Sequence, residues 1–556
     1  MEFPRIIIAA LRGGSGKTLL SIGIIAALSE SGKSIAPFKK GPDYIDAGWL
    51  ALAAGRPCYN LDSFLLNEEQ NLQSFLAHSI DCDISVIEGN RGLYDGIDLQ
   101  GSTSTAELAK LIKCPVILCV DSTKITRTMA AVVAGCIQFD PEVSIKGVIL
   151  NRVANARHEK KLRDSIEHYC RIPVLGAIPK LSEQHFPERH LGLVPTPEHG
   201  WATDSIAAVT RIAQQHIDLE AIVEITQQAP KLNAEVGMRN AETKNQQPAT
   251  SSQQPATSSQ RPATRNQRPA TRNQRPAASD QEPAASNQEP AASNQKPEAS
   301  NQKPETRSQQ PATSTQRPGT SDQQPKPRIG VLKDSAFQFY YPENIDALAA
   351  GGAEVIFISP LKDRGLPELD ALYIGGGFPE THAEQLSNNK NFNSQLKALA
   401  KDGFPIYAEC GGLMYLGENL VLEGTSYPMA GILPLTFDFY QRPQGHGYTI
   451  FKVERENPYY EVGSEIRGHE FHYSRVSNWT GEKNDLVFHM KRGVGIAKDR
   501  DGIVYKNVLA TYTHVHAIGT PQWAVALIRR ATLFQKKSIA GNEVIITQPG
   551  QAGIDD

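Results

Sequence analysis

Two short stretches of this sequence combine residue types that can do phosphate or nucleophilic chemistry. Near the N-terminus, the apolar run Arg5–Ala10 leads through Leu11 and Arg12 into a glycine-rich turn, 13–18, and then directly into an apolar helix. Much further along, the apolar run Phe404–Ala408 leads into a cysteine flanked by small residues and a second helix. In both places, a turn at the end of a predicted strand carries the candidate reactive group.

The turn after Arg12 has the composition of a phosphate-binding loop. Glycines let backbone N–H groups curl around phosphate oxygens, and the N-terminus of the following helix adds positive potential. Lys17 would reach the β- and γ-phosphates, and the Thr18 hydroxyl would bind Mg²⁺. Leu11 stands where the general pattern has its first glycine, which indicates a deviant subgroup. The alternative is a glycine-rich turn that only starts a helix. The expected ATP-binding residues are Gly13, Gly14, Ser15, Gly16, Lys17, Thr18 and Lys39.

Carboxylates that could serve Mg²⁺ follow two predicted strands and one charged loop. Glu88 ends the apolar run Ile84–Glu88, where a carboxylate can hold Mg²⁺ directly or through water. Asp121 ends Val116–Asp121 and is a weaker candidate of the same kind. The segment 38–46 packs two lysines and two carboxylates around a Gly-Pro turn, and a solvated charged loop is its alternative interpretation.

The cysteine turn resembles a nucleophile elbow. A sharp turn needs small neighbours around the nucleophile, and Ala408 and Gly412 provide them. We expect the new helix N-terminus to lower the pKa of the Cys410 thiol. A buried structural cysteine is the alternative for any isolated thiol. The flanking pattern favours a catalytic nucleophile.

A base and an oxyanion site must come from other segments. His514 and His516 end a strand-like run and, by alternation, share one face. We expect Cys410 and His514 to form a catalytic dyad. Either the site has no third member, or His516 serves only to orient His514. The glycines of the turn at 375–377 follow another predicted strand, and their N–H groups could stabilise an oxyanion. The expected oxyanion residues are Gly376, Gly377 and Gly411.

Composition excludes several classes of function. The chain has 556 residues and a formal net charge of −3, so no basic surface field indicates nucleic acid or an anionic membrane as a partner. No apolar stretch approaches the roughly 20 residues of a membrane span. Seven cysteines without a CxxC pair fit reduced thiols. We therefore expect a cytoplasmic protein that acts on small molecules.

Alternating strand and helix patterns on both sides of a polar stretch predict two doubly wound, mainly parallel α/β domains. We expect an ATP-binding domain at 1–239, a disordered linker at 240–327, a second domain at 328–540 and a flexible tail at 541–556. In the linker, proline recurs at every seventh residue from Pro248 to Pro325, among Gln, Ala, Ser, Thr and Asn. Such a segment cannot form a core, so it predicts a tether; a proline-rich ligand for a partner domain is the alternative.

Several of these motifs together resemble the cobyrinic acid a,c-diamide synthase family. They are FKKGPDYID at 38–46, EGNRGLYDG at 88–96, GGGFPE at 375–380 and AECGGLMYLG at 408–417. The resemblance extends over nearly the whole chain except the linker. It implies a first domain with a fold similar to dethiobiotin synthetase. The second domain would be a class I glutamine amidotransferase of the cobalamin type.

The resemblance also implies a reaction. Members of the family use ATP, Mg²⁺ and L-glutamine to amidate the a and c acetate groups of cobyrinate, a corrinoid. Cys410 would release ammonia from glutamine, and the first domain would activate the carboxylate as an acyl phosphate. By resemblance, Mg²⁺ would be held by Thr18, Glu88 and Asp43, and the substrate would meet Tyr44 and Asp46.

Related interpretations stay open at this point. Hydrogenobyrinate or nickel sirohydrochlorin could replace cobyrinate, and cobyric acid synthases share both domains. A partition-type ATPase switch has a Lys-Gly-Gly-x-Gly-Lys-Thr loop that aligns with 12–18. Arg12 in place of its lysine and the attached glutaminase domain argue against that switch. The sequence is compatible with a homodimer.

Overall fold

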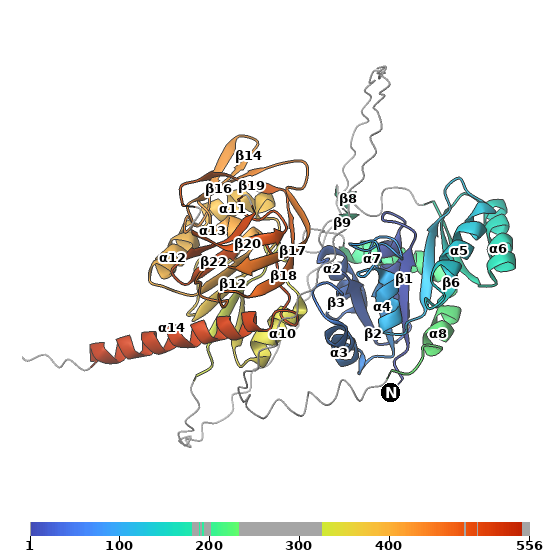
Figure 1. Cartoon of the computed structure of the whole chain (residues 1–556), viewed down its shortest axis with the longest axis horizontal. Coiled ribbons are helices and arrows are strands. Elements are labelled where there is room, and N and C mark those ends of the chain that lie inside the picture. Colours follow the sequence, from blue (N-terminus) through green and yellow to red (C-terminus); the bar gives the residue numbers. More distant parts are fainter. Residues whose placement is uncertain are drawn as a thin grey trace, which may run out of the picture. The chain divides into compact units, whose positions relative to one another are not determined.

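The computed structural model describes residues 2–180, 188–189, 192–193, 202–232, 325–482, 485–497 and 499–546 (Figure 1). Residues 240–324 of the expected linker and 547–556 of the expected tail lie outside these ranges. All seven cysteines fall inside them, and all are free thiols.

The first half of the chain builds a parallel seven-stranded sheet in the order β3-β2-β4-β1-β5-β6-β7. Its central strand is β1, and later strands add on both sides of it, so the sheet is doubly wound as predicted. The short apolar runs form these strands because both faces of a parallel sheet are covered. The strands are β1 (Arg5–Ala10), β2 (Ile35–Lys40), β3 (Tyr59–Leu61), β4 (Ile84–Glu88), β5 (Val116–Asp121), β6 (Ile145–Val153) and β7 (Val174–Pro179).

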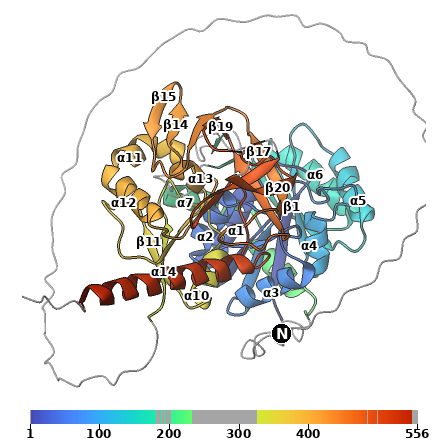
Figure 2. The same ribbon diagram turned by 60° about the vertical axis from the view of Figure 1, so that its left-hand side comes forward.

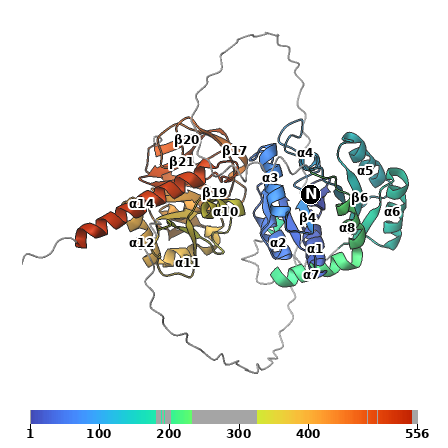
Figure 3. The same ribbon diagram turned by 90° about the horizontal axis from the view of Figure 1, so that it is seen from below.

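Helices cover both faces of this sheet. Along β1, Ile6 and Ile8 belong to one hydrophobic core, whereas Ile7 and Ala9 belong to the other, as the two-residue period of a strand requires. The first core is closed by α1 (Lys17–Glu30), α2 (Ile45–Ala54), α7 (Ala202–His216) and α8 (Leu219–Gln227). The second core is closed by α3 (Glu68–Ser79), α4 (Thr105–Leu111), α5 (Thr128–Phe139) and α6 (Ala156–Cys170). Figure 3 shows α5 and α6 side by side.

The second half of the chain is also α/β, but its sheet is extended in a way that the sequence did not predict. The nine strands follow the order β11-β10-β12-β13-β22-β21-β20-β17-β18. The first five pair in parallel, and the remaining pairings are antiparallel. Figure 2 shows β17 and β20 of the antiparallel part side by side. The parallel strands are β10 (Arg328–Leu332), β11 (Glu354–Ile358), β12 (Ala371–Ile374), β13 (Ile406–Glu409) and β22 (Val508–Thr511). The extension comprises β17 (Gly445–Val453), β18 (Glu465–His472), β20 (Leu486–Arg492) and β21 (Arg500–Tyr505).

Smaller elements complete both halves. A four-stranded sheet contains β14 (Asn419–Leu422), β15 (Thr425–Pro428), β16 (Leu435–Phe439) and β19 (Ser474–Trp479). The helices of the second half are α10 (Pro342–Ala350), the 3₁₀ helix η4 (Pro379–His382), α11 (Ala383–Asn388), α12 (Lys390–Lys401), α13 (Gly411–Leu416) and α14 (Gln522–Ile546). A short β8–β9 pair spans Glu188–Arg189 and Gly192–Leu193. In the described part of the chain, no helix is long and apolar enough to cross a membrane.

The topology places candidate reactive residues together. In each sheet, parallel strands end at a common edge, so the turns that follow them are neighbours. In the first sheet this edge gathers the turns after β1, β2 and β4. In the second sheet it gathers the turns after β12, β13 and β22. The predicted fold class of two α/β domains is confirmed.

A buried arginine holds the opposite, amino end of the first sheet. The side chain of Arg5 on β1 is fully buried and donates to four backbone carbonyls. The acceptors are Phe3 O at 2.7 Å, Ile112 O at 2.7 Å, Lys113 O at 3.1 Å and Pro230 O at 2.7 Å. Arg5 thereby ties the end of α4 and the segment after α8 to the sheet.

We predict that Arg5→Met destabilises the protein, because it leaves buried carbonyl groups without donors. The expected loss in free energy of unfolding is about 2–4 kcal/mol. Chemical denaturation measures it, with Arg157→Met as the control because Arg157 is exposed on α6. The control should stay within about 0.5 kcal/mol of the parent. Equal unfolding curves for the two variants would contradict this role of Arg5.

Candidate active sites

The predicted phosphate-binding loop has a backbone shape that only its glycines allow. Gly14 and Gly16 adopt φ angles of 71° and 91°, in the left-handed region, directly before α1 begins at Lys17. Asn151 of β6 fixes the loop from one side, because its amide donates to Ser15 O at 2.8 Å. A Cβ at Gly16 would lie 2.2 Å from that amide nitrogen. The loop therefore has no room for a side chain at this position.

The other side of the loop is open. An added Cβ at Gly13 or Gly14 would meet no atom within 4 Å. The amino group of Lys17 is mostly buried and donates to Arg91 O at 2.9 Å. Burial lowers the pKa of Lys17. An open glycine turn, a helix N-terminus and a lysine together can hold a nucleotide polyphosphate.

Residues from three neighbouring turns meet beside this loop. The Thr18 hydroxyl donates to Glu88 Oε1 at 2.7 Å and lies 3.3 Å from Asp46 Oδ2. The Lys39 amino group donates to the same two oxygens, at 3.0 Å for Glu88 and 2.7 Å for Asp46. We call Thr18, Lys39, Asp46 and Glu88 the carboxylate cluster. Its members come from α1, β2, α2 and β4.

Charge balance explains why a lysine is buried in this cluster. Lys39 is only 2% exposed, and burial alone would lower its pKa. The neighbouring Asp46 and Glu88 outweigh burial and raise the pKa of Lys39. Burial conversely raises the pKa of Glu88, although Lys39 opposes that effect. The cluster is thus a compact set of oxygens around one fixed cation.

The cluster fits Mg²⁺ by the chemistry of its donors. Mg²⁺ prefers oxygen ligands and usually takes one or two protein carboxylates together with phosphates and waters. Glu88 Oε2 is buried and has no hydrogen-bond partner among the described residues, so it can accept a further ligand. Within the same described residues, no group of three or more His, Cys, Asp or Glu side chains has the arrangement of a metal site. Thr18, Asp46 and Glu88 would need phosphate or water oxygens to complete the ligands of Mg²⁺.

Asp43 lies just outside the cluster. Its Oδ2 is 4.0 Å from the Lys39 amino group, and its Oδ1 accepts the backbone N–H of Asp46 at 3.0 Å. Burial and the nearby Asp46 raise the pKa of Asp43 to about 7. In this structure Asp46, rather than Asp43, contacts the Thr18 hydroxyl. The sequence analysis expected Asp43 at the metal and Asp46 at the substrate, and both assignments remain predictions.

Asp121, the weaker metal candidate, forms ion pairs with two arginine side chains. Its Oδ2 lies 2.8 Å from Arg152 Nη1 and 3.4 Å from Arg12 Nη2. Although burial opposes it, hydrogen bonds from Thr123 and Arg152 lower the pKa of Asp121 to about 2. This ion pair links the ends of β5 and β6 beside the phosphate loop.

The predicted nucleophile turn is present at Cys410. This residue has φ 48° and ψ −97°, a strained conformation for a non-glycine residue, between β13 and α13. Its backbone N–H donates to Thr511 O of β22 at 2.8 Å. Gly412 has to be a glycine, because a Cβ there would lie 2.5 Å from Ile374 O. The turn holds the thiol at the carboxyl edge of the second sheet.

The expected lowering of the Cys410 pKa is wrong. Burial raises the pKa of this thiol, and the carboxylate of Glu380 adds to the effect. The backbone N–H of Gly411 opposes the rise but does not outweigh it. Since α13 has only six residues, its N-terminus is a weak source of positive potential. The thiol therefore needs a base to become a thiolate.

His514 lies where such a base is needed. Its backbone pairs with His469 of β18, and the two imidazole rings stack with centroids 4.8 Å apart. A Cβ added at Gly376 would lie 2.4 Å from His514 Cε1 and 3.2 Å from Nε2. A Cβ added at Gly411 would lie 3.3 Å from the carbonyl carbon of Gly376. The His514 ring and the turn that carries Cys410 thus both lie against Gly376.

The predicted oxyanion residues adjoin one another. A Cβ at Gly411 would lie 2.9 Å from the backbone nitrogen of Gly377. A Cβ at Gly377 would lie 2.0 Å from Ala336 O, so this position also requires glycine. The structure therefore brings Gly376, Gly377 and Gly411 together beside Cys410. Backbone N–H groups in this arrangement can receive a developing negative charge.

His516 does not contact His514 through its ring nitrogens. Its Nε2 lies 3.5 Å from Glu343 Oε1, and its Nδ1 accepts the backbone N–H of Ile518 at 3.3 Å. The carboxylate nearest to His514 belongs instead to Glu409, a residue that the sequence analysis did not single out. In the sequence, Glu409 could have been noticed as a charged residue at the end of an otherwise apolar strand.

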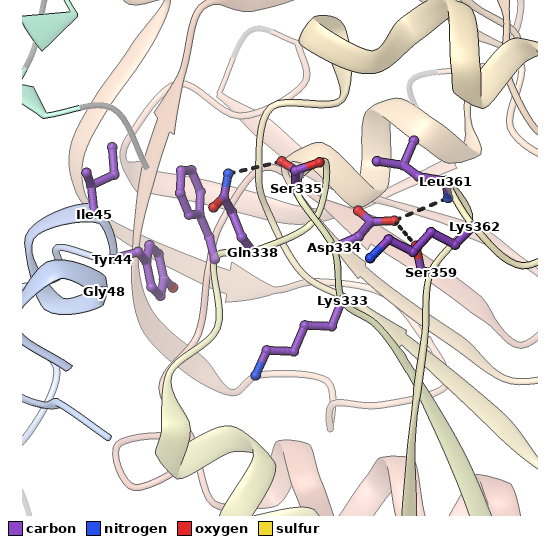
Figure 4. A pocket seen from close by; sticks show the side chains of 11 residues that line it. Tyr44, Ile45, Gly48, Lys333, Asp334, Ser335, Gln338, Ser359, Leu361 and Lys362 are labelled. Atoms are coloured by element: carbon purple, nitrogen blue, oxygen red, sulfur yellow. Dashed lines mark hydrogen bonds between the residues drawn. The ribbon is translucent and has the colours of Figure 1, made fainter. Parts of the chain in front are cut away.

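Tyr44 connects the two candidate sites. Its ring stacks on Phe339 with centroids 5.3 Å apart and lies 5.5 Å from the His514 ring. Tyr44 also lines a cavity of about 530 Å³ together with Lys333 and Gln338 (Figure 4). The segment 38–46 thus carries Lys39 and Asp46 of the carboxylate cluster near its two ends. Tyr44, which lies between them in the sequence, packs beside the imidazole of His514.

Two family models match this chain, one in each half. Residues 6–193 match the family model of the CobQ/CobB/MinD/ParA nucleotide binding domain, and residues 328–521 match that of the CobB/CobQ-like glutamine amidotransferase domain. Each match contains one of the two turns described above.

Curated relatives named cobyrinate a,c-diamide synthase match over nearly the full chain. The protein of Magnetococcus marinus is 38% identical over 529 residues, which is 95% of this chain and 97% of the relative. That of Archaeoglobus fulgidus is 34% identical over 532 residues, or 96% and 98%. That of Listeria innocua is 35% identical over 520 residues, or 93% and 97%. The chain, with its phosphate loop and its nucleophile turn, therefore belongs to the cobyrinate a,c-diamide synthase family.

Proposed function

We propose that this enzyme converts cobyrinate to cobyrinate a,c-diamide in cobalamin biosynthesis, with ATP and L-glutamine as co-substrates. Residues 1–239 would activate the carboxylates, and residues 328–540 would supply ammonia from glutamine. The observation that carries the proposal is the presence, in one member of this family, of a phosphate loop with a carboxylate cluster and of a strained Cys410 turn that lies, like the His514 ring, against Gly376.

The glutaminase half has the groups for thioester chemistry. His514 Nε2 takes the proton of the Cys410 thiol, and the thiolate attacks the amide carbon of glutamine. The N–H groups of Gly377 and Gly411 stabilise the resulting oxyanion. His514 then returns the proton to the leaving nitrogen, which departs as ammonia, and water hydrolyses the thioester to glutamate.

The synthetase half has the groups for phosphoryl transfer. The N–H groups of the loop at 13–16 and the amino group of Lys17 bind the phosphates of ATP. Lys39 offsets the negative charge that gathers when a substrate carboxylate attacks the γ-phosphate. The products are ADP and an acyl phosphate, and ammonia then displaces the phosphate to form the amide.

Thr18, Glu88 and Asp46 would hold Mg²⁺, which neutralises phosphate charge when it is bound. Asp43 would support this set through its bond to the Asp46 backbone. Tyr44 borders both the cavity of Figure 4 and His514, which supports its proposed contact with substrate and a short route for ammonia.

We predict that Cys410→Ala abolishes amidation with glutamine but leaves amidation with free ammonia within about threefold of the parent. The reason is that only ammonia release uses the thiol. Product formation by mass spectrometry measures both reactions. Cys114→Ala removes another buried thiol and should keep both activities. Loss of the ammonia-dependent reaction in Cys410→Ala would contradict the division of labour.

Glu88→Gln should have the complementary effect. The change keeps the volume but removes a carboxylate charge from the cluster, so amidation with either nitrogen source should fall on the order of 100-fold or more. Glutamine hydrolysis by itself should persist. The matched control is Glu107→Gln, which alters a partly exposed ion pair with Lys110. Unchanged amidation in Glu88→Gln would rule out a role of this residue in phosphoryl transfer.

A further inference from the structure

Glu409, the residue before Cys410, places its carboxylate beside the imidazole of His514. Glu409 ends β13 and pairs in register with Thr511 of β22, three residues before His514. The Oε2 atom of Glu409 lies 3.4 Å from His514 Nδ1, and both side chains are only 1% exposed. Glu409 ends β13 and Cys410 follows it directly, and the segment after β22 brings the His514 imidazole to the Glu409 carboxylate.

The Glu409 carboxylate accepts two hydrogen bonds that fix its position. The backbone N–H of Val515 donates to its Oε1 at 3.1 Å, and the Tyr373 hydroxyl donates to its Oε2 at 3.0 Å. Asn344 supports this arrangement, because its amide contacts the Tyr373 hydroxyl at 3.1 Å and donates to Val515 O at 2.9 Å. A buried carboxylate with two donors is fixed in place and keeps capacity for a third.

His514 Nδ1 has no better partner than Glu409. Among the residues that the structure describes, this nitrogen is buried and makes no hydrogen bond. Its ion-pair distance of 3.4 Å to Glu409 can shorten when the imidazole takes a proton, since catalytic hydrogen bonds often tighten in the substrate complex. An acceptor at Nδ1 keeps the proton there and leaves Nε2 free to receive the proton of a thiol.

His516, two residues after His514, has a carboxylate partner of its own. His516 forms its own buried pair with Glu343 at 3.5 Å, and its other nitrogen is taken by Ile518. The two histidines thus have separate carboxylate partners. Glu409 directly precedes Cys410, whereas Glu343 lies on α10.

We propose that Glu409 is the third member of the glutaminase site, a positioning residue that orients His514 and stabilises it when it takes the Cys410 proton. The inference rests on the proposed glutaminase function of this half of the chain. The His–carboxylate geometry carries it, and His516 has no part in it.

The test compares Glu409→Gln, Glu409→Asp and His516→Gln in the full-length enzyme. In Glu409→Gln, the amide NH₂ can donate to Nδ1 and so favour the tautomer whose Nε2 already carries a proton. That tautomer cannot accept a proton from a thiol. We expect kcat for glutamine hydrolysis to fall roughly 10²–10³-fold with KM changed less than about threefold. Amidation with free ammonia should be unchanged.

Two variants separate positioning from mere structural support. Glu409→Asp keeps the charge and should lose at least tenfold less kcat than Glu409→Gln. His516→Gln can still donate to Glu343, so its glutaminase kcat should stay within about threefold of the parent. If Glu409→Gln fails to fold, as loss of the ammonia-dependent reaction and of thermal stability would reveal, the contrast between Glu409→Asp and His516→Gln decides.

Several results would overturn the inference. Near-parental kcat in Glu409→Gln, or a larger loss in His516→Gln than in the Glu409 variants, would refute it while leaving the proposed function intact. A parent enzyme that hydrolyses no glutamine but still amidates with ammonia would remove the glutaminase proposal and this inference together. A parent that hydrolyses glutamine but amidates no corrinoid would leave the inference standing and refute only the substrate.

Discussion

A buried ammonium group is the constraint on which the synthetase site depends. Lys39 lies one residue before the end of β2, inside the protein, where an unpaired charge would cost several kcal/mol. Asp46 and Glu88 must therefore stay beside it, and each brings its own segment with it. Since Glu88 also accepts the Thr18 hydroxyl, the phosphate loop is tied to the same charge. One ion-pair network thus sets the relative positions of the turns after β1, β2 and β4.

The glutaminase site follows a different constraint, which is backbone strain. A positive φ at Cys410 is costly for any residue with a side chain, and glycines at 411 and 412 make room for the turn. The strand bonds from β13 to β22 hold the strained residue in place. The two sites are alike in topology, because both use the carboxyl edge of parallel strands. They differ in what fixes them.

Much of this could be predicted from the sequence. The apolar runs at Arg5–Ala10, Ile84–Glu88 and Val116–Asp121 coincide with β1, β4 and β5, because a strand buried on both faces leaves an unbroken hydrophobic signal. The glycine turns were equally clear, since few other sequences allow their φ angles. The antiparallel extension was missed, because a strand such as Gly445–Val453 has glycines and polar residues and is stabilised by its neighbours on both sides. Glu409 was missed because its partner His514 is far away in the sequence. The sequence could not show whether Asp43 or Asp46 contacts Thr18, because that depends on side-chain geometry.

The most direct test of the account is one incubation. The purified enzyme is given Mg²⁺, ATP, cobyrinic acid and glutamine labelled with ¹⁵N in its amide, and the corrinoid products are resolved by mass. The account predicts a product with two new amides, both labelled, at the a and c positions. Glutamine hydrolysis without any change to cobyrinate, together with amidation of a metal-free or nickel macrocycle, would contradict it.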